Sequence, residues 1–492
     1  MNRKASYRLL LCLTGAMLCA PVIFTTYVPL VDLPNHLARA HILHFYEQVA
    51  AYQASYAPAP APLPNLAVDV IVTQLLRFFG LLTAARVFLV LTVLLFVAGC
   101  HRLGRAIHGG PTWLAPPCCF VVYNSMLLYG FVNYVFGLGL FCVALSYWLE
   151  WRRELNAVRF ALVALLAVCS YLAHLSAYSF LCAASAVVAA WDYGAGKESL
   201  TKCALKLAPL GLPAALFVLN TRGGKAGGLG WNSPAGKAVG MLSPVLTYNY
   251  VLDACVLAAL ATIAAVALVL SRKGGGLGVA RPTFAAGCAL LLLYLLSPKA
   301  ALGGSAVDVR FVIPGLLLCV LSLKLRLGER AGKFLLLAVL CVFCVRVLAV
   351  WKTWAVLGRR IAAEVARFDV LPDGARVYPL VVMPRDVQRE KVERSFRHLQ
   401  SYATTSRHAF VPTLFTIEGQ QPLLFRERPR FVEASLYSPE EWRELSPRWL
   451  GYLDDYDYLW SYGLDDSLRA LVETRCAKVY EEDGFSLWRV NR

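Results

Sequence analysis

Charged residues are scarce in this sequence. Asp, Glu, Lys and Arg make up only 16% of its 492 residues, whereas 58% are hydrophobic and the mean hydropathy is +0.56. An ordinary soluble domain has about 25% charged and about 45–50% apolar residues, so this composition excludes a typical soluble protein. The sequence therefore predicts an α-helical polytopic membrane protein, whose chain crosses the bilayer many times.

Acidic residues are scarcest in the first 351 positions. The segment from Lys352 to the C-terminus holds 21 basic and 21 acidic residues, so the whole net charge of +17 lies before it. The basic residues of the first part cluster in alternate loops, such as Arg3 with Lys4, Arg102 with Arg105, and Arg272 with Lys273. This is the positive-inside pattern of membrane proteins rather than a nucleic-acid-binding surface. We therefore expect a cytoplasmic N-terminus and no nucleic-acid partner.

Apolar runs predict about eleven transmembrane helices, each needing about 17–25 residues to cross the bilayer. The expected spans are residues 8–29, 82–100, 112–128, 134–149, 157–172, 174–191, 203–219, 251–270, 283–297, 309–323 and 333–351. Threading them from a cytoplasmic N-terminus puts the basic loops on one side and the C-terminal segment on the other. The sequence thus predicts a transmembrane bundle over 1–351 and an extracytoplasmic domain over 352–492.

Two outer loops are long. The first covers 30–66 and contains the Pro-rich stretch YAPAPAPLPN, which forbids a membrane helix. It is followed by an amphipathic helix over 66–79, which we expect at the membrane interface. The second, 220–249, is rich in glycine, and we expect it to be mobile and able to cover a site.

The C-terminal segment has the pattern of a soluble α/β domain. A helix should end near Phe368, and strands are expected over 376–382 and 456–463. A helix over 465–474 and a hairpin turning at Asp483-Gly484 complete the prediction. The segment lacks a Gly-rich phosphate loop and a metal-ligand cluster, so we expect a supporting or acceptor-binding role for it.

Carboxylates on the outer side of the membrane part are the first candidates for chemistry, because ionisable groups at membrane depth are costly. They are Asp32, Glu47, Asp69, Asp253 and Asp308. Asp32 opens the stretch DLPNHLAR directly after the first span, where a simple helix cap is one explanation. A cap alone does not require His36, Arg39, His41 and His44, which follow within the next turns.

Asp308 lies in GGSAVDVRFVIPG, two residues before Arg310. If the backbone is extended there, the two side chains share a face and can pair or grip a phosphate. Plain anchoring at the membrane interface is the alternative explanation.

Three further polar residues are candidates for substrate contacts. Asn133 lies in a tight outer turn, where a purely turn-forming role is equally plausible. His174 occupies the next outer turn, and a lone histidine is often only structural. Arg346 lies in the outer half of the last span and needs an anion, either a ligand or a partner carboxylate.

A first outer loop that opens with Asp-x-Pro, many crossings and a C-terminal domain on the same side together resemble the C-type (GT-C fold) glycosyltransferase superfamily. The chain looks most similar to the aminoarabinose transferases and the protein O-mannosyltransferases of that superfamily. The match in motif is confined to Asp32, Pro34 and the helix after them. Many members have a second acidic residue beside the first, where this chain has Leu33.

The resemblance implies a reaction. Such enzymes move a sugar from a polyprenyl-phosphate donor to a hydroxyl of a lipid, glycan or protein acceptor, with inversion, here at the bacterial inner membrane. The first-loop carboxylate, Asp32, would be the general base, a role that contributes roughly 10² to 10⁴ in rate. Arginines would stabilise the departing phosphate. The expected substrate-binding residues are His36, Arg39, Asn133, His174, Asp308, Arg310 and Arg346.

A divalent metal is left open at this stage. Asp32, His36 and His174 carry suitable ligand atoms, but their spacing matches no established signature. Two other functions also remain: a transporter or flippase of a lipid-linked glycan, which predicts broken helices and internal repeats, and a membrane scaffold, which leaves the Asp32 cluster unexplained.

Overall fold

The computed structural model describes residues 3–492 except 60, 222–227, 274–275, 302 and 433–437. The chain divides into two compact units. The first comprises Met1–Phe24, Pro62–Ala67 and Leu89–Trp351, and the second comprises Thr25–Ala61, Val68–Phe88 and Lys352–Arg492. Most of the first outer loop therefore belongs to the same unit as the C-terminal segment.

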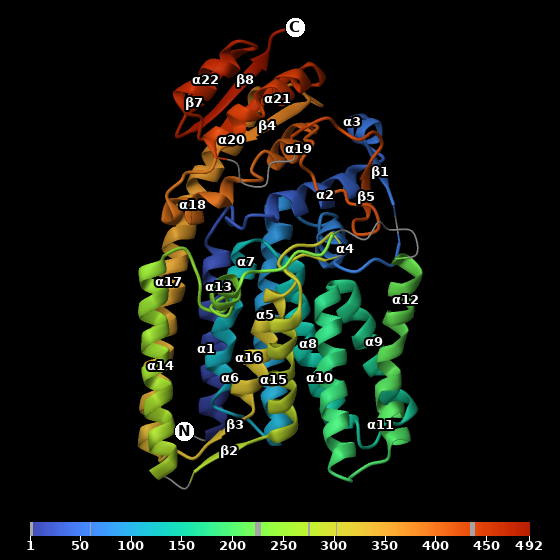
Figure 1. The fold of residues 1–492 in the computed structure, drawn as a ribbon, viewed down its shortest axis with the longest axis vertical. Coiled ribbons are helices and arrows are strands. Elements are labelled where there is room, and N and C mark those ends of the chain that lie inside the picture. The colour runs from blue at the N-terminus through green and yellow to red at the C-terminus, as the bar shows by residue number, and fades with distance from the viewer. Residues whose placement is uncertain (1–2, 60, 222–227, 274–275, 302, 433–437) are drawn as a thin grey trace. The chain divides into compact units, whose positions relative to one another are not determined.

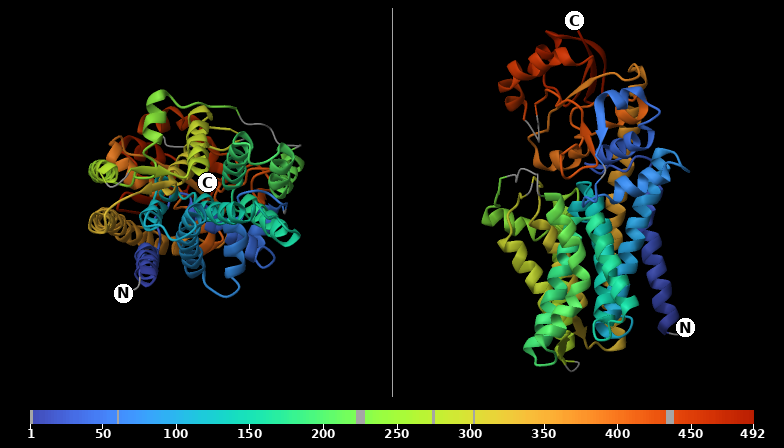
Figure 2. Two further views of the ribbon diagram at one scale, coloured as in Figure 1. Left: turned by 90° about the horizontal axis from the view of Figure 1, so that it is seen from below. Right: turned by 90° about the vertical axis from the view of Figure 1, so that its right-hand side faces the viewer.

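The first unit is a bundle of helices that lie side by side (Figures 1 and 2). Within the described residues, seven helices are long and apolar enough to cross a membrane. These are Ala5–Ile23, Leu81–His108, Val132–Trp151, Leu175–Gly194, Leu200–Val218, Tyr250–Arg272 and Glu329–Val370. Shorter apolar helices cover Ala115–Leu128, Ala157–Ala173, Arg281–Leu296 and Val309–Leu321. The prediction of a polytopic helical membrane protein is confirmed at this level.

Two predicted spans differ from the observed helices. Helix α1 (Arg3–Ile23) ends six residues before the predicted end at 29. Pro29 accounts for only the last of these residues, because proline disfavours helical backbone at Val28 before it. The predicted span 112–128 is three short pieces, α6 (Ala115–Cys119), η1 (Phe120–Val122) and α7 (Ser125–Leu128). The break falls at Asn124, whose side chain bonds the carbonyls of Val121 and Val122 and caps α7.

The remaining helices begin within four residues of the predicted spans. The last one, however, continues to Arg367, 16 residues beyond the predicted end at 351, and the one predicted over 82–100 continues to His108. These helices are α5 (Leu81–His108), α8 (Val132–Trp151), α9 (Ala157–Ala173), α10 (Leu175–Gly194), α11 (Leu200–Leu207), η2 (Ala208–Leu210), α12 (Gly211–Thr221), α14 (Tyr250–Lys273), α15 (Arg281–Leu296), η3 (Val309–Phe311), α16 (Val312–Leu321) and α17 (Glu329–Arg367). The second long loop contains a short helix, α13 (Pro234–Gly240). Residues 222–227 of that loop lie outside the described residues.

The two ends of the bundle differ in charge. The start of α1, helix α11 and the short β2–β3 pair (Leu277–Val279 with Leu323–Leu325) lie at one end, whereas α7 and α13 lie at the other (Figure 1). The basic clusters around Lys202, Arg272 and Lys324 are thus at the same end as the start of the chain. This arrangement agrees with the positive-inside pattern on which the threading was based.

Glycines allow α15 and α16 to pack closely. A side chain carbon added at Gly287 would lie 2.8 Å from the carbonyl oxygen of Gly315, which leaves no room for any larger residue. Small residues at helix contacts are a common means of close packing in membrane bundles.

The second unit contains a four-stranded sheet in the order β4-β6-β8-β7. Strands β4 (Val377–Val381) and β6 (Tyr458–Tyr462) are parallel, and β6, β8 (Phe485–Val490) and β7 (Cys476–Glu482) pair antiparallel. The predicted hairpin turn is present, and both Asp483 and Gly484 have positive φ, as a two-residue type I′ loop requires. The other helices of the C-terminal segment are η4 (Phe368–Val370), α18 (Val387–Glu393), η5 (Arg394–Phe396), α19 (Ser401–Arg407), α20 (Pro439–Glu444), α21 (Ser446–Tyr452), η6 (Leu453–Asp455) and α22 (Asp466–Glu473).

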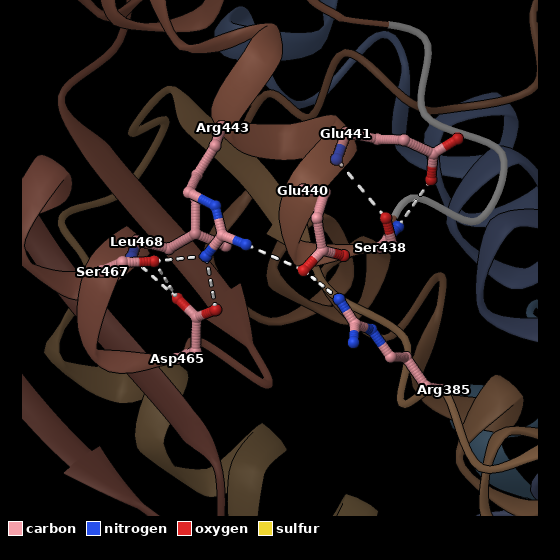
Figure 3. Close-up of polar contacts among 8 residues, drawn as sticks. All are labelled: Arg385, Ser438, Glu440, Glu441, Arg443, Asp465, Ser467 and Leu468. Carbon is pink, nitrogen blue, oxygen red and sulfur yellow. Dashed lines mark hydrogen bonds and ion pairs between the residues drawn. The ribbon is translucent and has the colours of Figure 1, made fainter.

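A polar network fixes α20 against the start of α22 (Figure 3). Ser438 and Glu441 form a capping box at the N-terminus of α20. Arg443 donates to Glu440 at 2.8 Å and to Asp465, the N-cap residue of α22, at 2.9 Å. Arg385 pairs with the same Glu440.

The first outer loop is built into this unit. Its elements are α2 (Leu33–Phe45), α3 (Ala50–Ser55) and β1 (Tyr56–Pro58), and they are followed by α4 (Ala67–Leu75). Strand β1 pairs antiparallel with β5 (Leu423–Phe425). Ile42, Tyr52 and Tyr56 lie in one buried core with Trp442 and Trp488 of the C-terminal segment. Residues 33–58 of the loop therefore have a fixed conformation within this unit.

Candidate functional site

Asp32 occupies the N-cap position of α2, and Pro34 lies in the first turn of that helix. The backbone at Asp32 is helical (φ −90°, ψ −7°), and among the described residues its side chain makes no capping hydrogen bond. An N-cap side chain normally accepts from the second or third backbone N–H of the helix with extended backbone. The helix-cap explanation therefore does not account for this carboxylate, which points elsewhere.

The Asp32 carboxylate faces a histidine from the C-terminal segment. His398 Nε2 lies 3.5 Å from Asp32 Oδ1, with side-chain exposures of 8% and 14% respectively. The positive charge of Arg397 acts on the same carboxylate. Sequence reasoning missed both residues, because they are separated from Asp32 by more than 360 positions and carry no local motif.

Arg39 does not face outward as a free cation. Its guanidinium is fully buried and makes a bidentate pair with Asp69 of α4, with Nε to Oδ1 at 2.5 Å and Nη2 to Oδ2 at 2.8 Å. Arg39 Nη2 also lies 3.2 Å from His36 Nδ1. Because an arginine only donates, His36 Nδ1 must accept, so its ring proton is on Nε2.

The two histidines near Asp32 are neutral. Burial, followed by the Arg39 charge, lowers the pKa of His36 to about 3. Burial lowers the pKa of His398 well below its usual range, with further contributions from Arg397 and His36. Both rings contact the edge or face of Phe415, at centroid distances of 5.8 Å and 5.3 Å. The site therefore presents one acid and two neutral imidazoles.

Helix α2 is fixed against α19 by side chains from both. Ser401 donates to Asn35 Oδ1 at 2.9 Å. His41 Nδ1 lies 2.9 Å from the hydroxyl of Tyr52, which donates in turn to the Thr404 carbonyl. Asn35 Nδ2, Arg39 Nη1 and His398 Nδ1 are buried polar atoms with no partner in the part of the chain that the structure describes.

Asn133 and His174 lie near each other in the first unit. Asn133 Nδ2 donates to the carbonyl of Asn65 at 2.6 Å, and Asn65 Oδ1 accepts from Leu175 N at 3.1 Å. His174 caps α10 by accepting from Ser176 N at 3.1 Å. Asn65, which has a positive φ of 67°, thus ties the starts of α8 and α10 together. These contacts are structural, and substrate binding by Asn133 and His174 stays a prediction.

The region around Asp308 differs from the prediction. The backbone at 309–311 is a 3₁₀ helix, so the premise that extended backbone puts Asp308 and Arg310 on one face is wrong. Asp308 caps that helix at Val309 N, and its other oxygen accepts from Lys237 Nζ at 2.7 Å and Asn232 Nδ2 at 2.8 Å.

Lys237 on α13 was not predicted to matter. Its amine donates at 2.7 Å to the carbonyls of Tyr294 and Ser297 as well as to Asp308. Tyr294 OH donates back to the Lys237 carbonyl. The described part of the Gly-rich loop is therefore anchored at α13.

Arg310 lies close to the Asn133 and His174 group. Its guanidinium lies 5.2 Å from the centre of the Phe131 ring and donates to the Ser305 carbonyl at 2.9 Å. Tyr134 OH donates to the Arg310 carbonyl at 2.8 Å, and the Tyr134 ring contacts His174. Arg310, Asn133 and His174 are thus brought together at the starts of η3, α8 and α10.

Arg346 is fully buried and hydrogen-bonds backbone carbonyls, and the charge of Asp253 also acts on its guanidinium. Its guanidinium donates to the carbonyls of Phe120, Tyr123 and Pro244, the first at 3.3 Å and the last at 3.1 Å. The Tyr123 carbonyl belongs to the break between η1 and α7, and Phe120 is the first residue of η1. Arg346 therefore satisfies the ends of a broken helix, and its predicted contact with substrate stays a prediction.

The predicted site residues fall into two groups. Asp32, His36 and Arg39 belong to the second unit, whereas Asn133, His174, Asp308, Arg310 and Arg346 belong to the first. Over the described residues, no group of three or more His, Cys, Asp or Glu side chains is arranged to hold a metal ion.

Crystal structures of ArnT from Cupriavidus metallidurans, an aminoarabinose transferase of the GT-C fold, have this fold. One is bound to undecaprenyl phosphate and one is in the apo state. Each matches with a TM-score of 0.54 over 99% of this chain and 98% of ArnT, at 11% sequence identity. No family model matches the sequence, and no curated protein matches it significantly. The predicted resemblance is thus confirmed for the fold.

Proposed function

Because the chain has the fold of ArnT, we propose that it is a membrane glycosyltransferase that uses a polyprenyl-phosphate-linked sugar. The acceptor is a hydroxyl of a lipid, glycan or protein, and transfer proceeds with inversion at the anomeric carbon. An isoprenoid tail of such a donor partitions into lipid, which suits a chain with many apolar helices.

Asp32 is the general base of the proposed reaction. Its carboxylate takes the proton of the acceptor hydroxyl as the oxygen attacks the anomeric carbon. The bond from that carbon to the phosphate oxygen breaks, and the polyprenyl phosphate leaves with the electron pair. The observation that carries this proposal is a partly exposed carboxylate at a helix start, not used as a cap and faced by His398.

Cations assist the departing phosphate, whose negative charge grows in the transition state. Arg397 takes this role in the second unit, because it already lies in the field of Asp32 and its Nε has no partner among the described residues. Arg310 is the corresponding candidate of the first unit. Arg39 is a poor candidate, since Asp69 neutralises its charge.

The proposed arrangement in the cell follows the charge pattern. Residues 1–351 form the transmembrane bundle of a bacterial inner-membrane protein, with the N-terminus in the cytoplasm. Residues 352–492 form an extracytoplasmic α/β domain that binds the acceptor. The sheet of that domain and the clustering of basic loops at one bundle end support this arrangement.

The experiment compares Asp32→Asn with wild type in lipid nanodiscs. The probes are undecaprenyl-phosphate-linked pentose, aminopentose and hexose, with lipid A and a Ser/Thr-containing peptide as acceptors. We expect Asp32→Asn to bind undecaprenyl phosphate as wild type does and to lose at least about 10²-fold in transfer. Asp373→Asn is the matched control, because Asp373 also faces a histidine, His408 at 2.7 Å, and is exposed. Full transfer by Asp32→Asn would refute the proposed base.

A transporter or flippase of a lipid-linked glycan is the second candidate. It is favoured by the broken segment 115–128 and by the interrupted helix pair α11 and α12. This function predicts movement of the intact donor across a vesicle membrane without cleavage of the sugar–phosphate bond. It also predicts that Asp32→Asn, a nearly isosteric change, leaves transport unaffected.

A further inference from the structure

The imidazole of His398 lies 3.5 Å from the Asp32 carboxylate, and it comes from the C-terminal segment. The segment that carries it runs from η5 to α19, and α19 packs on α2. Asp32 starts α2, so the packing of α2 on α19 sets the distance between the two groups. The pair is thus a product of tertiary structure and not of a local motif.

The protonation of His398 follows from its neighbours. Asp32, as the ionised base of the proposed function, can only accept, so the ring nitrogen that faces it, Nε2, carries the proton. His398 Nδ1 is buried and lacks a partner within the described parts, and the neighbouring Arg397 disfavours a second proton on the ring. His398 is therefore a neutral donor aimed at one carboxylate oxygen.

We propose that His398 is a positioning residue for Asp32, holding one carboxylate oxygen through Nε2–H so that the other faces the acceptor hydroxyl. Arg397 acts with it by keeping the carboxylate ionised. The proposal rests on the proposed function and extends it, because it assigns the C-terminal segment a direct part in the reaction site. The 3.5 Å separation is long for a hydrogen bond, and such contacts often shorten when substrate binds.

Other charged groups near Asp32 and His398 also contribute to the pH dependence of activity. They are His36 and Arg39 on α2, Asp69 on α4, and Arg394 with its partner Glu390. Arg39 and Arg394 are each paired with a carboxylate. Arg397 is thus the cation whose loss changes the field at Asp32 most directly.

The test measures kcat/KM against pH for the full chain in nanodiscs, with the undecaprenyl-phosphate sugar that the wild type uses best. His398→Leu removes the donor, and His398→Gln retains an N–H near the place of Nε2. Removing a hydrogen bond to a carboxylate raises its pKa, so the acid limb should move upward by about one pH unit in His398→Leu. His398→Gln should keep the wild-type limb and most of the activity.

Arg397→Gln provides an independent variant. It should also move the acid limb upward, and added salt should reduce the difference from wild type because salt screens the lost charge. His44→Gln, a partly exposed histidine further along α2, should match wild type. If His398→Leu does not fold, the pH profiles of kcat/KM for His398→Gln and Arg397→Gln still test the proposed roles of the two residues.

Three results would overturn the inference. An unshifted acid limb in His398→Leu would make the role of His398 structural, and an unshifted limb in Arg397→Gln would limit Arg397 to stabilising the departing phosphate. Loss of all turnover in His398→Gln would indicate that the imidazole itself takes the proton. Either result together with an inactive Asp32→Asn leaves the proposed function standing, whereas an active Asp32→Asn would refute both.

Discussion

Single residues near Asp32 show what a local pattern can and cannot predict. The spacing of Asp32, His36 and Arg39 is that of one helix face, so their proximity followed from the sequence. The partners of Arg39 and of its helix neighbour Asn35 did not. Asp69 lies 30 positions from Arg39, and Asn35 bonds a serine 366 positions away. No periodicity links such residues, so the sequence did not reveal that Arg39 pairs with a buried carboxylate.

The Arg39–Asp69 pair should be important for stability. Removing one partner leaves an uncompensated charge in a fully buried place, which typically costs about 3–5 kcal/mol. We expect Arg39→Met and Asp69→Leu each to lower the unfolding temperature in detergent strongly. The double variant should be more stable than the sum of the single losses predicts, as a double-mutant cycle would measure. Additive losses would mean that the two side chains do not interact.

His36 should make the protein sensitive to acid. Its pKa is about 3 when folded and 6.5 as the ordinary value, so the unfolded chain binds more protons between these limits. The contribution of this group to the free energy of unfolding is fully present above about pH 6.5. It falls as the pH drops, by about 2 kcal/mol at pH 5. His36→Asn keeps an acceptor for Arg39 but does not titrate. Denaturant unfolding at pH 5 and 7 should show a smaller difference in this variant, and an equal difference would contradict the assignment.

At the scale of elements, predictions succeeded where turn chemistry and composition agreed. The hairpin at Asp483-Gly484 was expected from its turn residues, and both adopt positive φ. The span 112–128 failed, because hydropathy does not register that Asn124 competes for backbone groups. Nor does hydropathy show that a distant arginine, Arg346, donates to the carbonyls of Phe120 and Tyr123 beside the break.

Arg346 should be required for the broken segment. Arg346→Met removes a donor from the carbonyls of Phe120, Tyr123 and Pro244, although Phe120 O still accepts from Tyr123 N. Each buried carbonyl that loses its partner costs about 1–3 kcal/mol. We expect poor yield and a clear loss of thermal stability in detergent, and a smaller loss for Arg346→Lys. Undecaprenyl phosphate should bind the folded Arg346→Lys protein as it binds wild type. Selective loss of that binding at unchanged stability would support the substrate role instead.

For the whole molecule, helix content and charge distribution were readable from composition, whereas the grouping of segments was not. The first outer loop looked like an extended Pro-rich connection, yet β1 pairs with β5 and Tyr52 shares a core with Trp442. Such long-range pairing depends on side chains distant in sequence. Pro-rich composition alone does not indicate whether a partner strand exists.

The topology has a direct test. With an odd number of crossings and a cytoplasmic N-terminus, the C-terminus lies outside the cytoplasm. Alkaline phosphatase fused after Arg492 should be active in a bacterial host, and a green fluorescent protein fused there should be dark. Fusions placed after Lys197, in the loop between α10 and α11, should behave in the opposite way. A fluorescent C-terminal fusion would contradict the threading.

The engagement of Lys237 has a consequence for chemical labelling. Its three ammonium protons all bond oxygens, and its side chain is only 12% exposed. Acylating reagents need a deprotonated, accessible amine, so this lysine reacts only during moments when α13 lifts away. The rate of its acylation, measured by mass spectrometry, would then report how often that loop opens locally.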